Sequence, residues 1–271
     1  MRLQGYDRVV YTHNPIVEAL CQARFIRMPE LTTPEGLISD LASLGYINSP
    51  TESPINIHVT VTGALVDSSP VTPPLLSRAF TTEDGMWLVA FNAESVTLAC
   101  KKDYPGWNVL MPRFVQLYEV YKKWFSGAKT IRLGLRYKDI IDRETLNLAG
   151  CPWHELIEPF LLGALAFGAF ADDEVITEDH VRSSLTQAAV KLDECSLGLN
   201  SALMRATLEP SKTIFLIDAD FFKTADSGSE LAATHTQLKQ NLNVLHEHAG
   251  ALFRRGIKER LHDALGPKNG N

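Results

Sequence analysis

The chain has 271 residues, of which 45% are hydrophobic and 21% are charged, and its formal net charge at pH 7 is −6. This composition is typical of a globular protein with ample material for a core. The overall acidity argues against general nucleic-acid binding, although a local basic face would still permit it.

The first predicted element is a strand near the N-terminus. After the turn-like pair Asn14-Pro15, apolar and polar residues alternate through the segment IVEALCQARF. Alternation at period two is typical of a sheet strand with one buried face. We therefore expect a strand at Val17–Ile26, with Val17, Cys21 and Phe25 buried. The opposite face carries Glu18, Gln22 and Arg24.

A helix, a strand and a hairpin are expected next. Thr33-Pro34-Glu35 combines a hydroxyl cap, a proline and an acid, which favours a helix start, and Gly45 is expected to end this helix. Alternation over residues 55–69 predicts a strand, which a proline-rich loop follows. Residues 85–103 predict a hairpin with its turn at 92–95.

The middle of the chain predicts a second helix and a second alternating strand. Apolar residues recur at helical spacing over 109–125, with Pro112 in the first turn and Gly127 after the end. A strand is expected at Ile131–Asp139, with Leu133 and Leu135 buried. Its other face carries Arg132, Gly134, Arg136 and Lys138.

The second half has a similar order of elements. We expect an apolar helix at Phe160–Phe170, strands within 179–193, 201–209 and 213–222, and a long helical run that Ser227 caps and Gly256 breaks. Elements in this order favour an antiparallel sheet covered by helices. We therefore predict an α+β fold with helices packed on an antiparallel sheet, in two structurally similar halves, 1–150 and 151–271.

The two alternating strands suggest a charged sheet face, formed by Glu18, Arg24, Arg132, Arg136 and Lys138. One interpretation is a solvated face with cross-strand ion pairs, in which Glu18 meets Arg136 or Arg132. The other is a binding surface for an anionic or acidic partner. Gly134 would weaken its strand, so we expect another backbone or a bulky side chain to approach it closely.

Asp218 and Asp220 share a predicted strand face and form an alternative cation site. Two carboxylates are too few ligands for a convincing site, so we expect no metal there. The eight histidines lack metal-ligand spacing, and the chain has no glycine-rich phosphate loop and no GxSxG segment. We therefore predict no cofactor.

The cysteines and the apolar runs bear on the location of the protein. Four cysteines, at positions 21, 100, 151 and 195, lie far apart without a Cys-x-x-Cys spacing, which indicates reduced thiols in a cytoplasmic protein. The N-terminus lacks the apolar core of a secretion signal. The run at Phe160–Phe170 is shorter than a membrane span of roughly 20 residues, so we expect no membrane contact.

Two short motifs carry a resemblance to a known family. The segment PIVEA at 15–19 and the segment GLRY at 134–137 resemble the PxVEA and GLRY motifs of a sporadically distributed family of bacterial proteins of about this length. The resemblance extends over most of the chain, and it implies no known enzymatic activity. The matched positions are Pro15, Glu18, Gly134, Arg136 and Tyr137.

The function that we predict is non-enzymatic binding or scaffolding of a protein partner. The patchy distribution of the resembled family suggests a component of a bacterial mobile-element or defence-linked system. One alternative is an enzyme or nucleotide-binding protein that uses the arginine-bearing sheet face. Another is a nucleic-acid accessory protein. The sequence leaves the oligomeric state open, self-association included.

Overall fold

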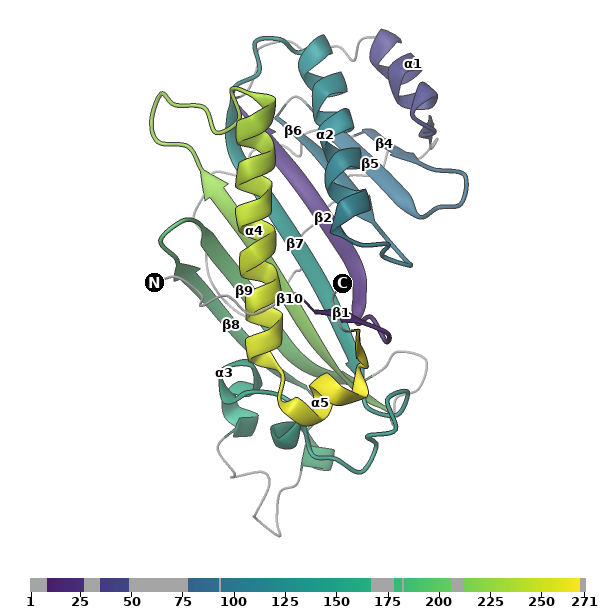
Figure 1. The fold of residues 1–271 in the computed structure, drawn as a ribbon, viewed down its shortest axis with the longest axis vertical. Helices are drawn as coiled ribbons and strands as arrows, with labels where there is room; N and C mark the ends of the chain where they lie inside the picture. Colours follow the sequence, from purple (N-terminus) through teal and green to yellow (C-terminus); the bar gives the residue numbers. More distant parts are fainter. Residues whose placement is uncertain are drawn as a thin grey trace.

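A computed structural model describes residues 9–26, 35–48, 78–92, 94–166, 178–181, 183–205 and 212–268. These residues form one large antiparallel sheet with helices packed against it (Figure 1). The predicted α+β class is therefore confirmed. The strand and loop predicted over residues 55–74 lie outside the described residues.

The large sheet contains nine strands among the described residues, and all neighbouring pairs are antiparallel. In sheet order they are β3 (Ile47–Asn48), β4 (Arg78–Thr81), β5 (Trp87–Asn92), β6 (Ser95–Cys100), β2 (Ile16–Phe25), β7 (Thr130–Asp142), β10 (Thr213–Thr224), β9 (Ser196–Arg205) and β8 (Ser184–Lys191). The predicted hairpin is β5–β6. A separate pair joins β1 (Val10–Tyr11) to β11 (Pro267–Lys268) near the chain ends.

Two long helices, α2 (Trp107–Trp124) and α4 (His235–Gly256), lie side by side on one face of the sheet (Figure 1). The helix α1 (Glu35–Ser43) packs beside α2, and Gly45 follows it with φ of 86°. The short helices α3 (Pro159–Leu162) and α5 (Glu259–Ala264) lie at one end of the sheet. Single 3₁₀ turns occur at Trp153–Glu155, Gly163–Ala166 and Glu178–His180.

The core lies between the sheet and the helices. The predicted buried residues Cys21, Phe25, Leu133 and Leu135 are at most 2% exposed. The prediction for Val17 is wrong, because this side chain is 40% exposed. The pairing of β2 with β7 shifts between Ile16 and Glu18, so Val17 is the extra residue of a β-bulge and leaves the alternation.

The order of elements repeats along the chain. Each set consists of a long strand, a three-stranded meander and a long helix. The first set is β2, β4–β6 and α2, and the second set is β7, β8–β10 and α4. The sheet order places these two sets on either side of the central β2–β7 pair. The predicted halves therefore share one sheet, because β7 from 1–150 pairs with β10 from 151–271.

Three predicted helix boundaries are wrong. Pro112 lies inside α2 rather than in its first turn, because α2 begins five residues earlier, after Gly106 with φ of 112°. Thr234, not Ser227, caps α4, in a reciprocal capping box with Gln237. Of the helix predicted at Phe160–Phe170, the described part is the four-residue α3 followed by a 3₁₀ turn, because Gly163 adopts φ of 57°; residues 167–170 lie outside the described residues.

The end of the chain matches the prediction in three features. The apolar stripe of α4 is buried at Leu238, Leu242, Leu245, Ala249 and Leu252. Gly256 ends α4, and a short terminal helix follows. Among the helices of the described residues, none is both long and apolar enough to cross a membrane.

Candidate functional site

The charged face predicted from β2 and β7 lies on the side of the sheet opposite α2 and α4, and its members form cross-strand ion pairs. Glu18 pairs with Lys138, directly opposite on β7, at 3.1 Å, and also with Lys101. Burial acts to raise the pKa of Glu18. The hydrogen bonds and charges of Lys101 and Lys138 outweigh this effect and hold the pKa below its usual value. The interpretation as cross-strand ion pairs is thus the one that the geometry favours.

The predicted partners of Glu18 were wrong. In the register of β2 on β7, Arg136 is opposite Leu20, and Arg132 is opposite Arg24. Arg136 instead binds both carboxylate oxygens of Asp218, with 2.5 Å between Nε and Oδ1, and Arg132 binds Asp220 at 2.7 Å. The carboxylates considered for a cation are therefore acceptors for arginine, and the arginines are neutralised within the sheet.

Gly134 has the close neighbour that its place in a strand predicts. A Cβ atom at this position would lie 2.7 Å from Nη1 of Arg132, whose guanidinium spans the glycine to reach Asp220 and Gln22. The same guanidinium lies over the ring of Phe222 at 4.4 Å. The glycine therefore makes room for a side chain, not for a ligand. Arg24, the remaining member of the predicted charged face, is exposed to solvent.

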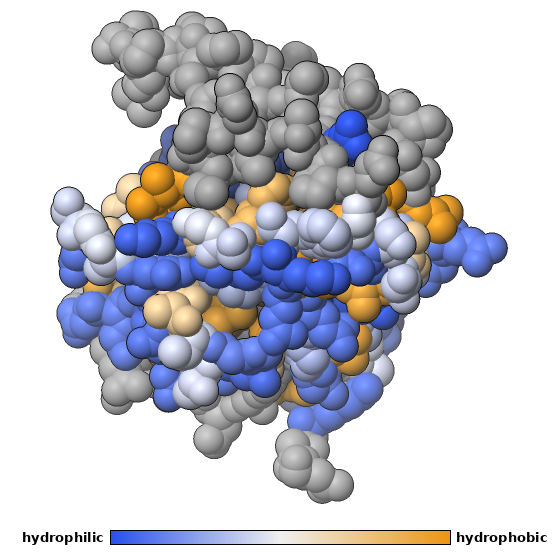
Figure 2. Space-filling model, turned by 90° about the horizontal axis from the view of Figure 1, so that it is seen from above, coloured by the Kyte–Doolittle hydropathy of each residue, from blue (hydrophilic) through white to orange (hydrophobic). Residues whose placement is uncertain are grey.

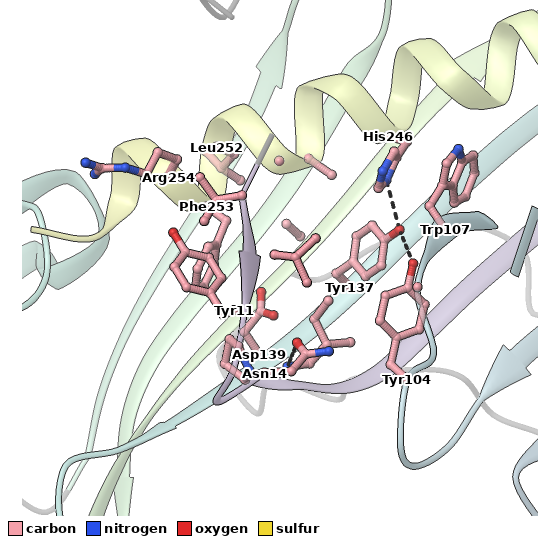
Figure 3. Close-up of a pocket in the computed structure, with 18 of the residues that line it drawn as sticks. Tyr11, Asn14, Tyr104, Trp107, Tyr137, Asp139, His246, Leu252, Phe253 and Arg254 are labelled. Carbon is pink, nitrogen blue, oxygen red and sulfur yellow. Dashed lines mark hydrogen bonds between the residues drawn. The ribbon is translucent and has the colours of Figure 1, made fainter. Parts of the chain in front are cut away.

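A cavity of about 570 Å³ lies on the other side of the sheet, beneath α4 (Figure 3). The strands β7 and β10 form its floor, and α4 its roof. The helix α2 begins only at Trp107, so beyond this point α4 alone extends over the sheet (Figure 1). The small side chain of Ala219 leaves room above the floor, and Gly250 lines the cavity at an exposed position of α4.

Asp139 is the charged residue in the floor of this cavity, and it is 5% exposed. Figure 3 shows its side chain between Tyr11 and Tyr137, directed toward α4. Within the described ranges, its carboxylate has no hydrogen bond and no ion pair. Burial, together with the nearby charge of Asp218, raises the pKa of Asp139 to about 7.

A chain of hydrogen bonds lines one side of the cavity. The hydroxyl groups of Tyr104 and Tyr137 are 3.1 Å apart, and the Tyr137 hydroxyl is also 3.1 Å from Nδ1 of His246 (Figure 3). The ring of Trp107 stacks on His246 at 4.4 Å, and its Nε1 donates to Asn243. These contacts fix three aromatic rings around the space above Asp139.

The paired strands β1 and β11 lie at the opposite side of the cavity, where β1 lines it. In β1, Tyr11 pairs with Pro267, while the backbone of Thr12 donates to Gly266. The Tyr11 hydroxyl lies 2.9 Å from Nδ1 of His262, and its ring makes an edge contact with Phe253. Burial raises the pKa of Tyr11 to about 12. This side of the cavity is therefore aromatic and held in place by backbone hydrogen bonds.

Both motifs of the resemblance contribute to the cavity. Pro15 and Ile16 from the first motif and Tyr137 from the second line it, and Ala19 is the direct cross-strand partner of Tyr137. The sequence prediction placed the site on the charged face instead. The missed signal was Asp139: continuing the alternation from Leu133 through Tyr137 puts an acid on the apolar face of β7.

The remaining features do not form a comparable site. All four cysteines are buried as free thiols, and burial raises the pKa of Cys21, Cys100 and Cys195. Figure 2 shows hydrophilic and hydrophobic side chains interspersed at one end of the molecule. The exposed large hydrophobic residues lie on separate elements: Val10, Val17, Ile26, Ile47, Val109, Phe160 and Leu185. Comparison with known proteins finds no matching family model and no similar curated protein.

Proposed function

We propose that this protein is a non-enzymatic binding protein and that the cavity beneath α4 receives its ligand. The observation that carries the proposal is a buried carboxylate, Asp139, without a partner in the described residues, in the floor of an apolar and aromatic cavity. Small-molecule sites are typically concave, apolar and about 300–1,000 Å³ in volume, with few polar groups that orient the ligand. A volume of about 570 Å³ lies within that range.

The energetic cost of the cavity supports the same proposal. Empty volume in a protein interior costs stability, and so does a buried carboxyl group without a partner. The neighbouring residues of β7 avoid this cost: Arg136 has Asp218, and Lys138 has Glu18. A fold that satisfies the charges on one face of β7 and leaves Asp139 unsatisfied on the other is best explained by a ligand that binds there.

The arginine-bearing face supports an enzyme or nucleotide site less well. Arg132 and Arg136 are bound by Asp220 and Asp218, so an incoming anion would have to displace a carboxylate. Alternating charges along this face also differ from the broad basic surface that nucleic acid requires. The proposal therefore concerns binding in the cavity.

The biological setting remains part of the proposal. A protein partner that responds to the ligand, and a mobile-element or defence-linked system, are supported only by the resemblance of PIVEA and GLRY. A pull-down from the native host, together with the neighbouring genes, would test this setting independently of the cavity.

The cavity itself is tested with N-phenylnaphthylamine, an uncharged apolar dye that fluoresces when it leaves water. We expect saturable binding with one site per chain. Gly250→Leu should weaken it by about tenfold or more, because Gly250 lines the cavity and a Cβ there meets nothing within 4 Å. Leucine also favours a helix over glycine, so this variant is expected to fold.

A second variant and a control complete the test. Ala219→Phe fills the cavity from the floor and should have the same effect, whereas Ala189→Phe, at an exposed position of β8, should leave dye binding unchanged. No saturable binding to the native protein, or binding to both filled variants as tight as to the native protein, would refute the cavity as the binding site.

A further inference from the structure

We infer that the ligand carries a protonated amine on an apolar body, and that its ammonium group binds the carboxylate of Asp139. This inference rests on the proposed function and specifies its ligand. The carboxylate is 5% exposed and faces the cavity, with both oxygens unpartnered in the described part of the chain. An ammonium group offers three hydrogen-bond donors and the opposite charge, which such a carboxylate lacks.

The charges around the cavity favour a cation. Glu247, on α4, lines the cavity and is exposed. The basic residue of the lining, Arg254, has its guanidinium engaged by Glu259 and by the backbone oxygen of Ile257. Behind the floor, Asp218 is paired with Arg136, and after burial its charge is the second cause that raises the pKa of Asp139. An anionic ligand would therefore meet repulsion from the floor and find the arginine already bound.

The aromatic residues fit the same group. The rings of Tyr11, Tyr104, Tyr137 and Trp107 line the cavity around Asp139. Aromatic faces attract organic cations, and they do so more strongly where water is excluded. The apolar residues Ile217, Ala219 and Leu252 would contact the body of the ligand. A neutral ligand would use these walls equally well but would leave the carboxylate without an opposite charge.

The inference also predicts a pH dependence. Asp139 must be ionised to bind an ammonium group, and its pKa in the empty cavity is about 7. Amine binding should therefore strengthen as the pH rises from about 5 to 8, while an aliphatic amine stays protonated throughout. The other ionisable groups that face this space or act across the floor are Tyr11, Tyr104, Tyr137, His246, Glu247, Arg254 and Asp218. Loss of the pH dependence in Asp139→Asn separates Asp139 from these groups.

The test uses a matched pair of ligands, phenylbutylamine and phenylbutanol, each displacing N-phenylnaphthylamine. They differ in charge but hardly in shape. With the native protein at about pH 8, the amine should bind at least about tenfold more tightly than the alcohol. At about pH 5 this ratio should fall towards one, because the carboxyl group is then protonated. This comparison needs no variant.

The Asp139→Asn variant should bind the two ligands within about twofold of each other at both pH values, with dye binding retained. The dye binding also shows that the variant is folded. Nα-acetyl-lysine N-methylamide tests whether a lysine of a partner protein supplies the amine. We expect phenylbutylamine to bind more tightly than this probe, because the cavity walls are apolar; the reverse order would assign the amine to a protein.

The failures of the two proposals are distinguishable. If the dye binds and the filled variants exclude it, but the native protein does not prefer the amine over the alcohol, then the ligand class is wrong and the cavity remains a binding site. A preference that persists in Asp139→Asn would also overturn the role of Asp139. If neither dye nor amine binds, both proposals fail.

Discussion

At the scale of single residues, two buried aspartates show how environment decides the role of a side chain. Asp218 is 1% exposed and Asp139 is 5% exposed, on opposite faces of neighbouring strands. Asp218 receives two hydrogen bonds from Arg136, so its charge is compensated. Asp139 receives none within the described residues, and its pKa rises to about 7. Burial alone therefore does not distinguish the two aspartates, whereas the lack of a compensating partner sets Asp139 apart.

This difference predicts a stability effect with a definite sign. The folded-state pKa of Asp139 is raised above the unfolded value of about 3.9, so ionisation destabilises the folded protein as the pH rises from about 4 through 7. The stability that the protonated carboxyl provides is complete below the unfolded value and lost above the folded one. Asp139→Asn cannot ionise, so it should be more stable than the native protein at pH 8, by about 2–4 kcal/mol, and should lose this advantage near pH 4.

Urea denaturation of both proteins at several pH values measures this effect. Asp218→Asn provides the contrast, because it leaves Arg136 without its carboxylate and should destabilise at pH 8 by about 3–5 kcal/mol. A destabilised Asp139→Asn at pH 8 would mean that the carboxylate has a stabilising partner in the folded protein.

At the scale of elements, two glycines on the strands that flank β10 provide a matched comparison. A Cβ on Gly134 would lie 2.7 Å from Nη1 of Arg132, whereas a Cβ on Gly198 of β9 meets nothing within 4 Å. Both glycines are paired close to Asp220: Gly198 is directly opposite it, and the Arg132 side chain crosses Gly134 to reach it. The two positions therefore differ mainly in what occupies the space above them.

Gly134→Val should destabilise the protein by about 1–3 kcal/mol, because the guanidinium of Arg132 must leave Gln22 and Asp220. Gly198→Val should be neutral or slightly stabilising, since a β-branched residue suits an open strand position. The free energies of unfolding in urea provide the comparison. Equal values for the two variants would show that Arg132 moves aside without cost.

The strands also show what could be predicted from the sequence. Period-two alternation identified β2 and β7 and, apart from Val17, their predicted buried residues, because that pattern is a property of one strand. The ion pairs could not be predicted in the same way, since they depend on register. The register of β2 on β7 places Glu18 opposite Lys138 rather than an arginine, and it shifts by one residue at Val17. The cavity depends on three distant features: the start of α2 at Trp107, the small side chain of Ala219 and the acid at Asp139.

At the scale of the whole molecule, the nine-stranded sheet connects the two repeated sets of elements. β7 and β10 pair continuously from Arg132–Thr224 to Asp142–Ile214. The helix α4, from the second half, packs on both β7 and β10 and contacts α2 from the first half. The cavity spans the same junction, with Tyr104 and Asp139 from one half and Ala219 and His246 from the other. Ligand binding should therefore depend on both halves being folded together.

The last prediction is that the two halves unfold as one unit. Leu135 and Phe221 are opposite each other on β7 and β10, and both are fully buried. Leu135→Ala should lower the free energy of unfolding by about 2–5 kcal/mol. Hydrogen exchange should report this loss equally at the most protected amides of β5 and of β9, because both exchange through the same global opening. If β5 and β9 instead lost unequal amounts of protection, the halves would open separately, and the cavity would lose its roof without unfolding the first half. Because both halves line the cavity, cooperative unfolding also predicts that the amine protects β5 and β9 alike.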